Sequence, residues 1–191
     1  MKIIAGSLKG KRLVYPKGLL HATTDKLRGA IFNIIEANFP DVLKQANMCD
    51  IFAGAGAVGI EAISRGAKFV AFIENNRKIV KYLRQNLIGL EDRTQVITND
   101  ALRIIPQLKS HKFDIIFLDP PYNTGLVEPV IKKIMKYELL NKNGIIIIEH
   151  SEKEEFILPE GLNLFKRKDY NDTVISILRS NYEKGSVSWE F

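Results

Sequence analysis

Four consecutive residues, Asp119-Pro120-Pro121-Tyr122, have types that suit the transfer of a group to an aromatic amine. Two successive prolines fix φ and remove two N–H donors, which leaves a stiff turn with outward carbonyl groups. The Asp119 carboxylate and the Pro120 carbonyl offer two acceptors for the two N–H bonds of an exocyclic amine. The ring of Tyr122 can stack on a base that has left its helix or loop. We therefore predict Asp119, Pro120 and Tyr122 as catalytic residues.

An exocyclic amine on a base is a poor nucleophile, because its lone pair is delocalised into the ring. Positioning and electrostatics must then supply much of the catalysis. As the nitrogen becomes cationic during in-line transfer, the Asp119 carboxylate would stabilise that charge more than it stabilises the neutral substrate. The alternative is a proline-rich turn that only ends a strand.

A glycine-rich segment, Gly54-Ala55-Gly56-Ala57-Val58-Gly59, follows a predicted strand and opens a predicted helix. Its glycines let the backbone turn tightly and approach a ligand, and the helix start presents free N–H groups. Glu74 ends the next predicted strand, where a carboxylate can accept hydrogen bonds from both ribose hydroxyls of an adenosine cofactor. Together these features predict an adenosine-containing ligand, although the glycines alone could serve packing.

Four acids, Asp50, Glu74, Asp100 and Asp119, fall at or just beyond the carboxyl ends of successive predicted strands. In an open parallel sheet these ends line the ligand crevice. Four carboxylates there would repel a pyrophosphate, whereas S-adenosylmethionine is cationic at sulfur and has no pyrophosphate. Asp100 taken singly is more typical of a solvated loop acid, but four acids at equivalent positions favour S-adenosylmethionine as the cofactor.

The elements that must position these residues alternate along the chain. Two short apolar segments around Gly6 and Gly10 predict a basic hairpin, and a helix follows from the N-cap candidates Thr23 and Thr24 to a stop at Pro40. Beyond it we predict strands at 47–52, 69–73, 94–97, 113–118 and 145–149, helices at 58–65, 77–87, 101–108 and 126–137, and two terminal strands at 162–168 and 173–179. This order predicts an α/β fold with a seven-stranded, mostly parallel sheet and an antiparallel C-terminal hairpin.

Bulk composition excludes several classes of protein. The 191 residues favour one domain with a sizeable core, and 46% hydrophobic with 26% charged residues is ordinary for a globular protein. No apolar run approaches the roughly 20 residues that span a bilayer. A lone cysteine, Cys49, forms no internal disulfide and suits a reducing compartment, so we expect a cytoplasmic protein. The three histidines lie far apart in sequence, and we predict no metal site.

Positive charge concentrates at the N-terminus. Residues 1–28 hold seven basic side chains against Asp25 alone, while the other 163 residues are formally neutral. A basic N-terminal segment on an otherwise neutral chain predicts a binding surface for a polyanion. The alternative is that the basic segment only aids solubility. We divide the chain into an RNA-contacting extension (1–40), a catalytic domain (41–180) and a tail (181–191). The predicted nucleic-acid-binding residues are Lys9, Lys11, Arg12, Lys26 and Arg28.

Segments 52–56, 72–75 and 119–122 resemble class I, Rossmann-like methyltransferase motifs. Segment 23–33, set after a basic hairpin, is similar to the bacterial RsmD family, the 16S rRNA guanine-N2 methyltransferases, and the match runs from about Lys2 to Arg179. The resemblance implies S-adenosylmethionine as cofactor and one guanine of 16S rRNA, in an assembled or assembling small subunit, as substrate. We expect a monomer. The predicted cofactor-binding residues are Asp50, Phe52, Gly54, Gly56, Gly59, Glu74, Asn75, Asp100 and Ala101.

The chain departs from the family pattern in the first helix region. Family members usually carry Arg-Pro where this chain has His21-Ala22, and Arg and Glu where it has Lys26 and Gly29. The departures weaken the RNA-contacting roles carried over to residues 21–28 and leave the cofactor site untouched.

Three rival classes share part of the pattern. A DNA adenine-N6 methyltransferase can use the same turn at 119–122, but 191 residues leave no room for a target-recognition domain. A nicotinamide-dependent oxidoreductase can use the same glycine loop, but leaves that turn unexplained. A binding protein could keep the fold without activity, against which the intact motifs argue.

Overall fold

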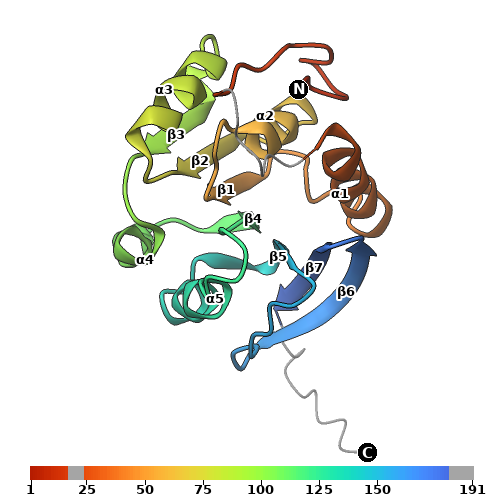
Figure 1. Cartoon of the computed structure of the whole chain (residues 1–191), viewed down its shortest axis with the longest axis vertical. Helices are drawn as coiled ribbons and strands as arrows, with labels where there is room; N and C mark the ends of the chain where they lie inside the picture. Colours follow the sequence, from red (N-terminus) through yellow and green to blue (C-terminus); the bar gives the residue numbers. More distant parts are fainter. Residues whose placement is uncertain (17–23, 181–191) are drawn as a thin grey trace, which may run out of the picture.

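A computed structural model describes residues 1–16 and 24–180 of the chain (Figure 1). The predicted tail and Thr23 lie outside these residues. The helices and strands are α1 (Asp25–Asn38), β1 (Asn47–Ile51), α2 (Ala57–Ser64), β2 (Phe69–Ile73), α3 (Arg77–Asn86), η1 (Glu91–Arg93), β3 (Thr94–Ile97), α4 (Ala101–Ile104), η2 (Ile105–Leu108), β4 (Phe113–Leu118), α5 (Val127–Lys136), β5 (Leu140–Ser151), β6 (Leu162–Tyr170) and β7 (Thr173–Ser180).

All seven strands form one sheet in the order β3-β2-β1-β4-β5-β7-β6. The first five strands pair in parallel, and β7 pairs antiparallel with both β5 and β6. The strand order reverses between β1 and β4, and this is where open α/β sheets bind their ligands. The predicted mostly parallel sheet with a C-terminal antiparallel hairpin is confirmed.

Helices cover both faces of this sheet, as the continuous isoleucine run of β5 requires. Ile145 and Ile147 point into a core shared with α1, α2 and α3, whereas Ile146 and Ile148 point into a core shared with α4 and α5. Side chains alternate between the faces of a strand, so a strand buried on both faces must be apolar at every position.

Several predicted boundaries were wrong. The predicted helix 101–108 is a four-residue α4 followed by the 3₁₀ turn η2, because Pro106 lacks the N–H that an α-helix needs there. The two segments of the predicted N-terminal hairpin do run antiparallel, with a bridge between Lys2 and Arg12 and a hydrogen bond from the Leu13 amide to the Met1 carbonyl, but they form no regular strands. The fifth strand is longer than 145–149 and begins at Leu140. By contrast Thr24 caps α1, since its Oγ1 accepts a hydrogen bond from the Leu27 amide.

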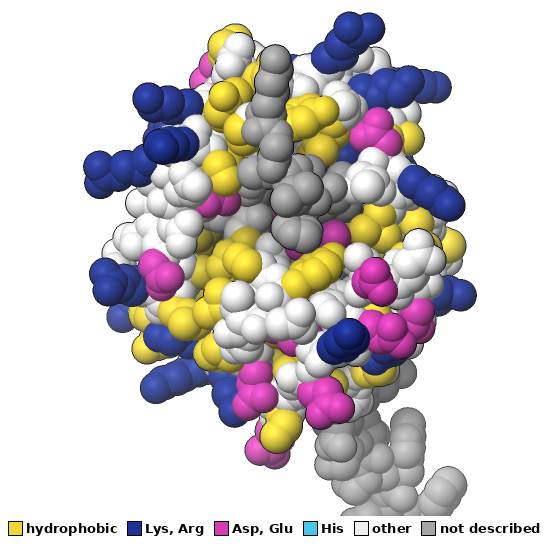
Figure 2. Space-filling view, viewed as in Figure 1, with side chains coloured by type: hydrophobic (Ala, Val, Ile, Leu, Met, Phe, Trp, Pro, Cys, Tyr) yellow, Lys and Arg dark blue, Asp and Glu magenta, His cyan; other side chains and the backbone are white. Residues whose placement is uncertain are grey.

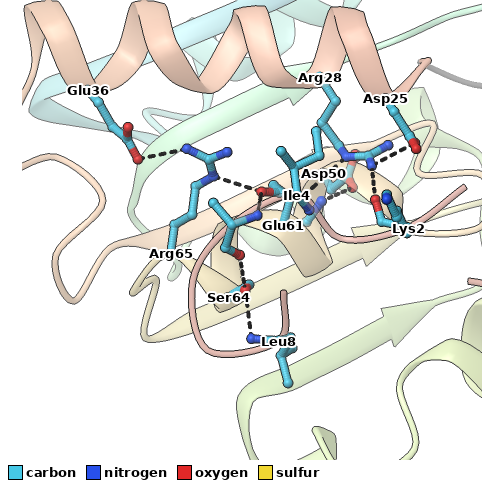
Figure 3. A network of polar contacts seen from close by, with 12 residues as sticks. Lys2, Ile4, Leu8, Asp25, Arg28, Glu36, Asp50, Glu61, Ser64 and Arg65 are labelled. Atoms are coloured by element: carbon cyan, nitrogen blue, oxygen red, sulfur yellow. Dashed lines mark hydrogen bonds and ion pairs between the residues drawn. The ribbon is translucent and has the colours of Figure 1, made fainter. Parts of the chain in front are cut away.

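The N-terminal loop is joined to α2 by a buried carboxylate (Figure 3). Glu61 is fully buried, and its two oxygens accept hydrogen bonds from the amides of Ile4 at 2.8 Å and Ala5 at 3.0 Å. The same carboxylate pairs with Arg65 at 2.8 Å and with Arg28 at 3.5 Å. Two backbone donors and two guanidinium groups thus offset the cost of burying its charge.

Arg28 was wrongly predicted to contact RNA. Its side chain has no exposed surface, and it donates to the carbonyl of Lys2 and pairs with Asp25 as well as Glu61. A guanidinium buried among these partners is not accessible to a phosphate. The role of Arg28 is to join α1 to the N-terminal loop and α2.

Close backbone contact fixes the same loop at a second point. Gly6 has φ +79°, and a Cβ built there would lie 1.8 Å from the carbonyl oxygen of Ser64. The Ser64 hydroxyl donates to the Ala5 carbonyl and accepts from the Leu8 amide at 2.9 Å. The basic loop is therefore held at a defined position on the C-terminal end of α2.

Candidate active site

A cavity of about 520 Å³ opens at the carboxyl ends of β1, β2 and β4. The predicted site residues that line it are Asp50, Phe52, Gly54, Glu74, Asn75, Asp100, Asp119, Pro120 and Tyr122. Residues that sequence reasoning missed also line it: Met1, Ala53, Ala55, Ala57, Val58, Asn76, Ile79, Phe117, Pro121 and Leu126. Most of these residues are next to a predicted residue in the sequence and could have been predicted for that reason. Met1 is different, because only the tertiary fold brings it to the cavity.

Glu74 holds the glycine loop at the edge of the cavity. It is 8% exposed, and its Oε2 accepts a hydrogen bond from the Gly54 amide at 3.0 Å while Oε1 accepts from the Asn76 amide at 2.8 Å. Each carboxylate oxygen has a second lone pair. Glu74 can therefore order the loop and still accept hydrogen bonds from a ligand.

Asp50 differs from the other acids of the cavity. It is 1% exposed, and its Oδ2 accepts a hydrogen bond from the Gly59 amide at 2.9 Å. Burial raises the pKa of Asp50 to about 8, with the nearby charge of Glu74 adding to the rise. At neutral pH Asp50 is therefore mainly protonated, so it does not add to the cavity the negative charge that we expected of it.

Three predicted cofactor-binding residues do not line the cavity. A Cβ on Gly59 would lie 2.3 Å from Cε1 of Phe72, and one on Gly56 would lie 2.4 Å from Cδ1 of Leu83. These glycines allow α2 and its preceding loop to pack closely against β2 and α3. Ala101 is buried in the core on the α4 side of the sheet.

The turn after β4 stands across the cavity from the glycine loop. Asp119 donates its backbone N–H to the Ile51 carbonyl at 3.3 Å, which ties the start of the turn to β1. Asp100 caps α4, its Oδ1 accepting from the Arg103 amide at 3.0 Å. Glu74, Asp100 and Asp119 thus line one cavity, and each follows the carboxyl end of a different strand, β2, β3 or β4.

Tyr122 is oriented by its hydroxyl group. Its oxygen lies 2.8 Å from Thr173 Oγ1 and 3.4 Å from Glu149 Oε1, on β7 and β5. Burial raises the pKa of Tyr122 to about 12, so the phenol stays protonated. The ring lines the cavity while its polar end is fixed to the sheet, which is the arrangement that stacking on a flat ligand requires.

The cavity suits a cationic adenosine derivative. None of the described residues that line it is Lys or Arg, whereas Glu74, Asp100 and Asp119 do line it. A Cβ at Gly54 would meet no atom within 4 Å, so the backbone there is open to a ligand. Phe52, Val58 and Ile79 supply an apolar wall. This donor set fits a sulfonium and a ribose better than a pyrophosphate.

Asn86 connects the cavity to the N-terminal segment. It is 3% exposed, exchanges two hydrogen bonds of 2.8 Å with the backbone of Val14, and donates another of 2.9 Å to the carbonyl of Ala55 in the glycine loop. Of the predicted RNA-contacting residues, Lys9, Arg12 and Lys26 are exposed, and Lys11 is half-buried beside the Ile88 carbonyl.

The sheet order, the glycine loop with Glu74, and the Asp-Pro-Pro-Tyr turn define a class I methyltransferase. A family model described as "Conserved hypothetical protein 95" matches residues 1–179. The chain belongs to this family, the RsmD family of methyltransferases.

Relatives agree with this placement. "Ribosomal RNA small subunit methyltransferase D" of Buchnera aphidicola is 34% identical over 88% of this chain and 87% of its own, and the protein of the same name from Escherichia coli is 33% identical over 88% and 84%. The solved structure of the Escherichia coli protein yhhF superposes with a TM-score of 0.83 at 29% identity, covering 94% of this chain and 97% of its own. A conserved hypothetical protein of Streptococcus pyogenes gives 0.71 at 31% identity, over 80% and 94%.

Proposed function

We propose that this methyltransferase acts on ribosomal RNA and transfers a methyl group from S-adenosylmethionine to the exocyclic N2 of a guanine in 16S rRNA. The observation that carries the proposal is the shared cavity: Asp119, Pro120 and Tyr122 line the same space as Glu74 and Asp100. The relatives named small subunit rRNA methyltransferase D support the RNA substrate. The choice of guanine N2 follows from the resemblance to the RsmD family.

The cofactor side of the cavity is the glycine loop. The open backbone at Gly54, the Glu74 carboxylate and Asp100 would hold the adenosine part, with Phe52 and Ile79 as its apolar wall. When bound, S-adenosylmethionine supplies an electrophilic methyl group on a sulfonium. In this proposal Asn75 lies at the rim, while Gly56, Gly59 and Ala101 act indirectly, by packing the loop and α4 in place.

The substrate side is the turn after β4. The Asp119 carboxylate and the Pro120 carbonyl would accept the two N–H bonds of the guanine amino group, and Tyr122 would stack on the base. Asp119 then stabilises the positive charge that develops on nitrogen. The carboxylate therefore lowers the free energy of the transition state more than that of the bound base, and the barrier falls. Because the base must leave its stack to enter the cavity, the target lies in a single-stranded segment, where extrusion costs least.

The proposal includes the setting of the reaction. The substrate is an assembled or assembling small subunit, the enzyme acts as a monomer in the cytoplasm, and Lys9, Lys11, Arg12 and Lys26 contact RNA phosphates. No helix in the described part of the chain is long and apolar enough to cross a membrane. No group of three metal-ligating side chains occurs among the described residues, and the proposed reaction uses none.

The test is tritium transfer from labelled S-adenosylmethionine to three acceptors: small subunits lacking the modification, naked 16S rRNA and unmethylated duplex DNA. After nuclease digestion we expect label as N2-methylguanine from rRNA. The Asp119→Ala variant should lose the transfer while it keeps cofactor affinity, and Asp92→Ala, an exposed acid on η1, should behave as wild type. Label in DNA as N6-methyladenine, or cofactor binding without transfer to any acceptor, would contradict the proposal.

A further inference from the structure

Helix α3 carries a stripe of cations that the overall charge count conceals. Its ten residues include Arg77, Lys78, Lys81 and Arg84 and no acid, and all four side chains are exposed. Arg77, Lys81 and Arg84 are spaced i, i+4, i+7, so they lie along one side of the helix. We call these three residues the α3 stripe.

The α3 stripe has no ion-pair partner among the described residues, 1–16 and 24–180. Some other surface cations do have one: Lys44 lies 2.9 Å from Asp41, Arg167 lies 3.0 Å from Asp169, and Lys112 lies 3.4 Å from Glu138. What distinguishes the stripe is that three cations follow one another along a helix that contains no acid. The exposed acids Glu91 and Asp92 follow only beyond the C-terminal end of the helix. The charge of the stripe is therefore uncompensated along its length.

Part of this arrangement is unfavourable for the helix, although Arg84 in the last turn suits the helix dipole and the Glu74 carboxylate accepts a hydrogen bond from the Asn76 amide at the helix start. Like charges at i, i+4 repel each other, and a cation in the first turn opposes the helix dipole, where an acid would be favourable. The first turn of α3 contains Arg77 and Lys78 and no acid. An anion bound along the helix would offset both the repulsion between the cations and the unfavourable cations in the first turn. A helix face that only contacts solvent does not require this arrangement of charges.

Helix α3, which carries the stripe, begins at the cavity and ends beside the N-terminal loop. Asn76, which caps α3, and Ile79 in its first turn both line the cavity. At the other end Asn86 bonds to Val14, and the Lys11 ammonium lies 3.5 Å from the Ile88 carbonyl. Figure 2 shows Lys and Arg side chains along the edge of the molecule where α3 lies, as well as at other points of the outline.

We propose that the α3 stripe binds phosphates of the RNA strand next to the target base, and so forms a second phosphate-binding surface besides the N-terminal loop. The inference rests on the proposed function, since it takes rRNA as the substrate. A base that turns into the cavity leaves its neighbouring phosphates outside, and the first turn of α3 forms part of the rim that they must cross. The stripe then directs the strand from the cavity toward Lys9 and Lys11.

The test compares two triple variants of the full chain. Arg77→Gln/Lys81→Gln/Arg84→Gln removes the stripe, and Lys109→Gln/Lys133→Gln/Lys136→Gln removes the same charge on the opposite face of the sheet. Affinity for unmodified 16S rRNA and for small subunits lacking the modification is measured over a series of KCl concentrations. Three lost phosphate contacts should reduce the slope of log K against log salt by about 2 and weaken binding roughly 10- to 100-fold at 0.1 M salt. The control should change neither.

Two further measurements separate the possible failures. Both triple variants should keep wild-type affinity for S-adenosylmethionine. The stripe variant should unfold at the wild-type temperature or slightly above it, because it loses charge repulsion within α3. Arg77→Lys/Arg84→Lys should keep RNA affinity, because a phosphate contact of this kind needs charge. If wild type neither binds nor methylates rRNA, the proposed function fails. If wild type methylates rRNA and the stripe variant shows the same salt slope as the control, the α3 inference alone is wrong.

Discussion

The phenol oxygen of Tyr122 lies 2.8 Å from Oγ1 of Thr173, so the turn after β4 is tied to the antiparallel strand β7. This hydrogen bond connects the parallel part of the sheet, which holds the glycine loop, to the C-terminal hairpin. The orientation of the ring that lines the substrate side of the cavity therefore depends on a strand 51 residues further along the chain.

Replacing Thr173 by Val should lower kcat by about fivefold, the equivalent of one hydrogen bond of roughly 1 kcal/mol. Thr173 acts through Tyr122, so the affinity for S-adenosylmethionine should stay at the wild-type value. Single-turnover methylation and cofactor titration measure the two quantities. Thr173→Ser keeps the hydroxyl and should restore most of the rate; equal losses in both variants would show that packing, and not the hydrogen bond, matters.

Asp50 should make the cofactor-free protein less stable as the pH rises. Burial raises its pKa to about 8 from an ordinary value of 3.8, so the folded state holds a proton that the unfolded state releases. The contribution of this proton to the stability of the folded state is complete below pH 4 and is lost as the pH rises to about 8. In urea unfolding at several pH values, the free energy of unfolding of Asp50→Asn should rise relative to that of wild type over this range, by on the order of a few kcal/mol. A difference between the two free energies of unfolding that does not change with pH would mean that Asp50 is ionised in the folded protein.

Gly59 in α2 and Gly54 in the loop before it should fail in different ways when each is replaced by Ala. Gly59→Ala forces a Cβ to within 2.3 Å of Phe72 and should lower the free energy of unfolding by about 1–3 kcal/mol.

Gly54→Ala has open space around its Cβ and a φ of +56°, so it should cost only about 1 kcal/mol of stability while it obstructs the cavity and weakens cofactor binding. Denaturation and cofactor titration of both variants give the comparison. The reverse pattern, with stability lost at Gly54, would contradict the assigned roles.

Removing Glu61 should be far more damaging than removing its neighbour in the network. Glu61→Ala leaves Arg28 buried with one carboxylate fewer and two backbone amides without acceptors, and should cost about 3–5 kcal/mol.

Glu36→Ala is the matched control. The Glu36 side chain is 49% exposed and pairs only at the surface with Arg65, so its loss should cost at most about 1 kcal/mol. Urea unfolding compares the two variants, and hydrogen exchange at the Ile4 and Ala5 amides reports whether the loop has come free. Unchanged exchange in Glu61→Ala would mean that other contacts hold the loop.

The sequence predicted the sheet and nine of the nineteen residues that line the cavity, because these depend on local pattern. The isoleucine run of β5 reports burial on both faces, and Glu74 and Asp119 follow directly from their position after a strand. Arg28 was misassigned because charge alone does not show which cations are buried. The roles of Glu61, Asn86 and Met1 depend on contacts more than 30 residues apart or across the fold, and no local pattern encodes these contacts.

The contacts of Asn86 with Val14 and Ala55 have an evolutionary consequence. One amide side chain serves the N-terminal segment, α3 and the glycine loop at once, and Glu61 and Ser64 anchor the start of the same segment to α2. The first sixteen residues are therefore not an independent module that recombination could exchange between relatives. A chimera that imports them must also import their anchoring residues, or it will combine an RNA-contacting loop with a catalytic core that cannot hold it.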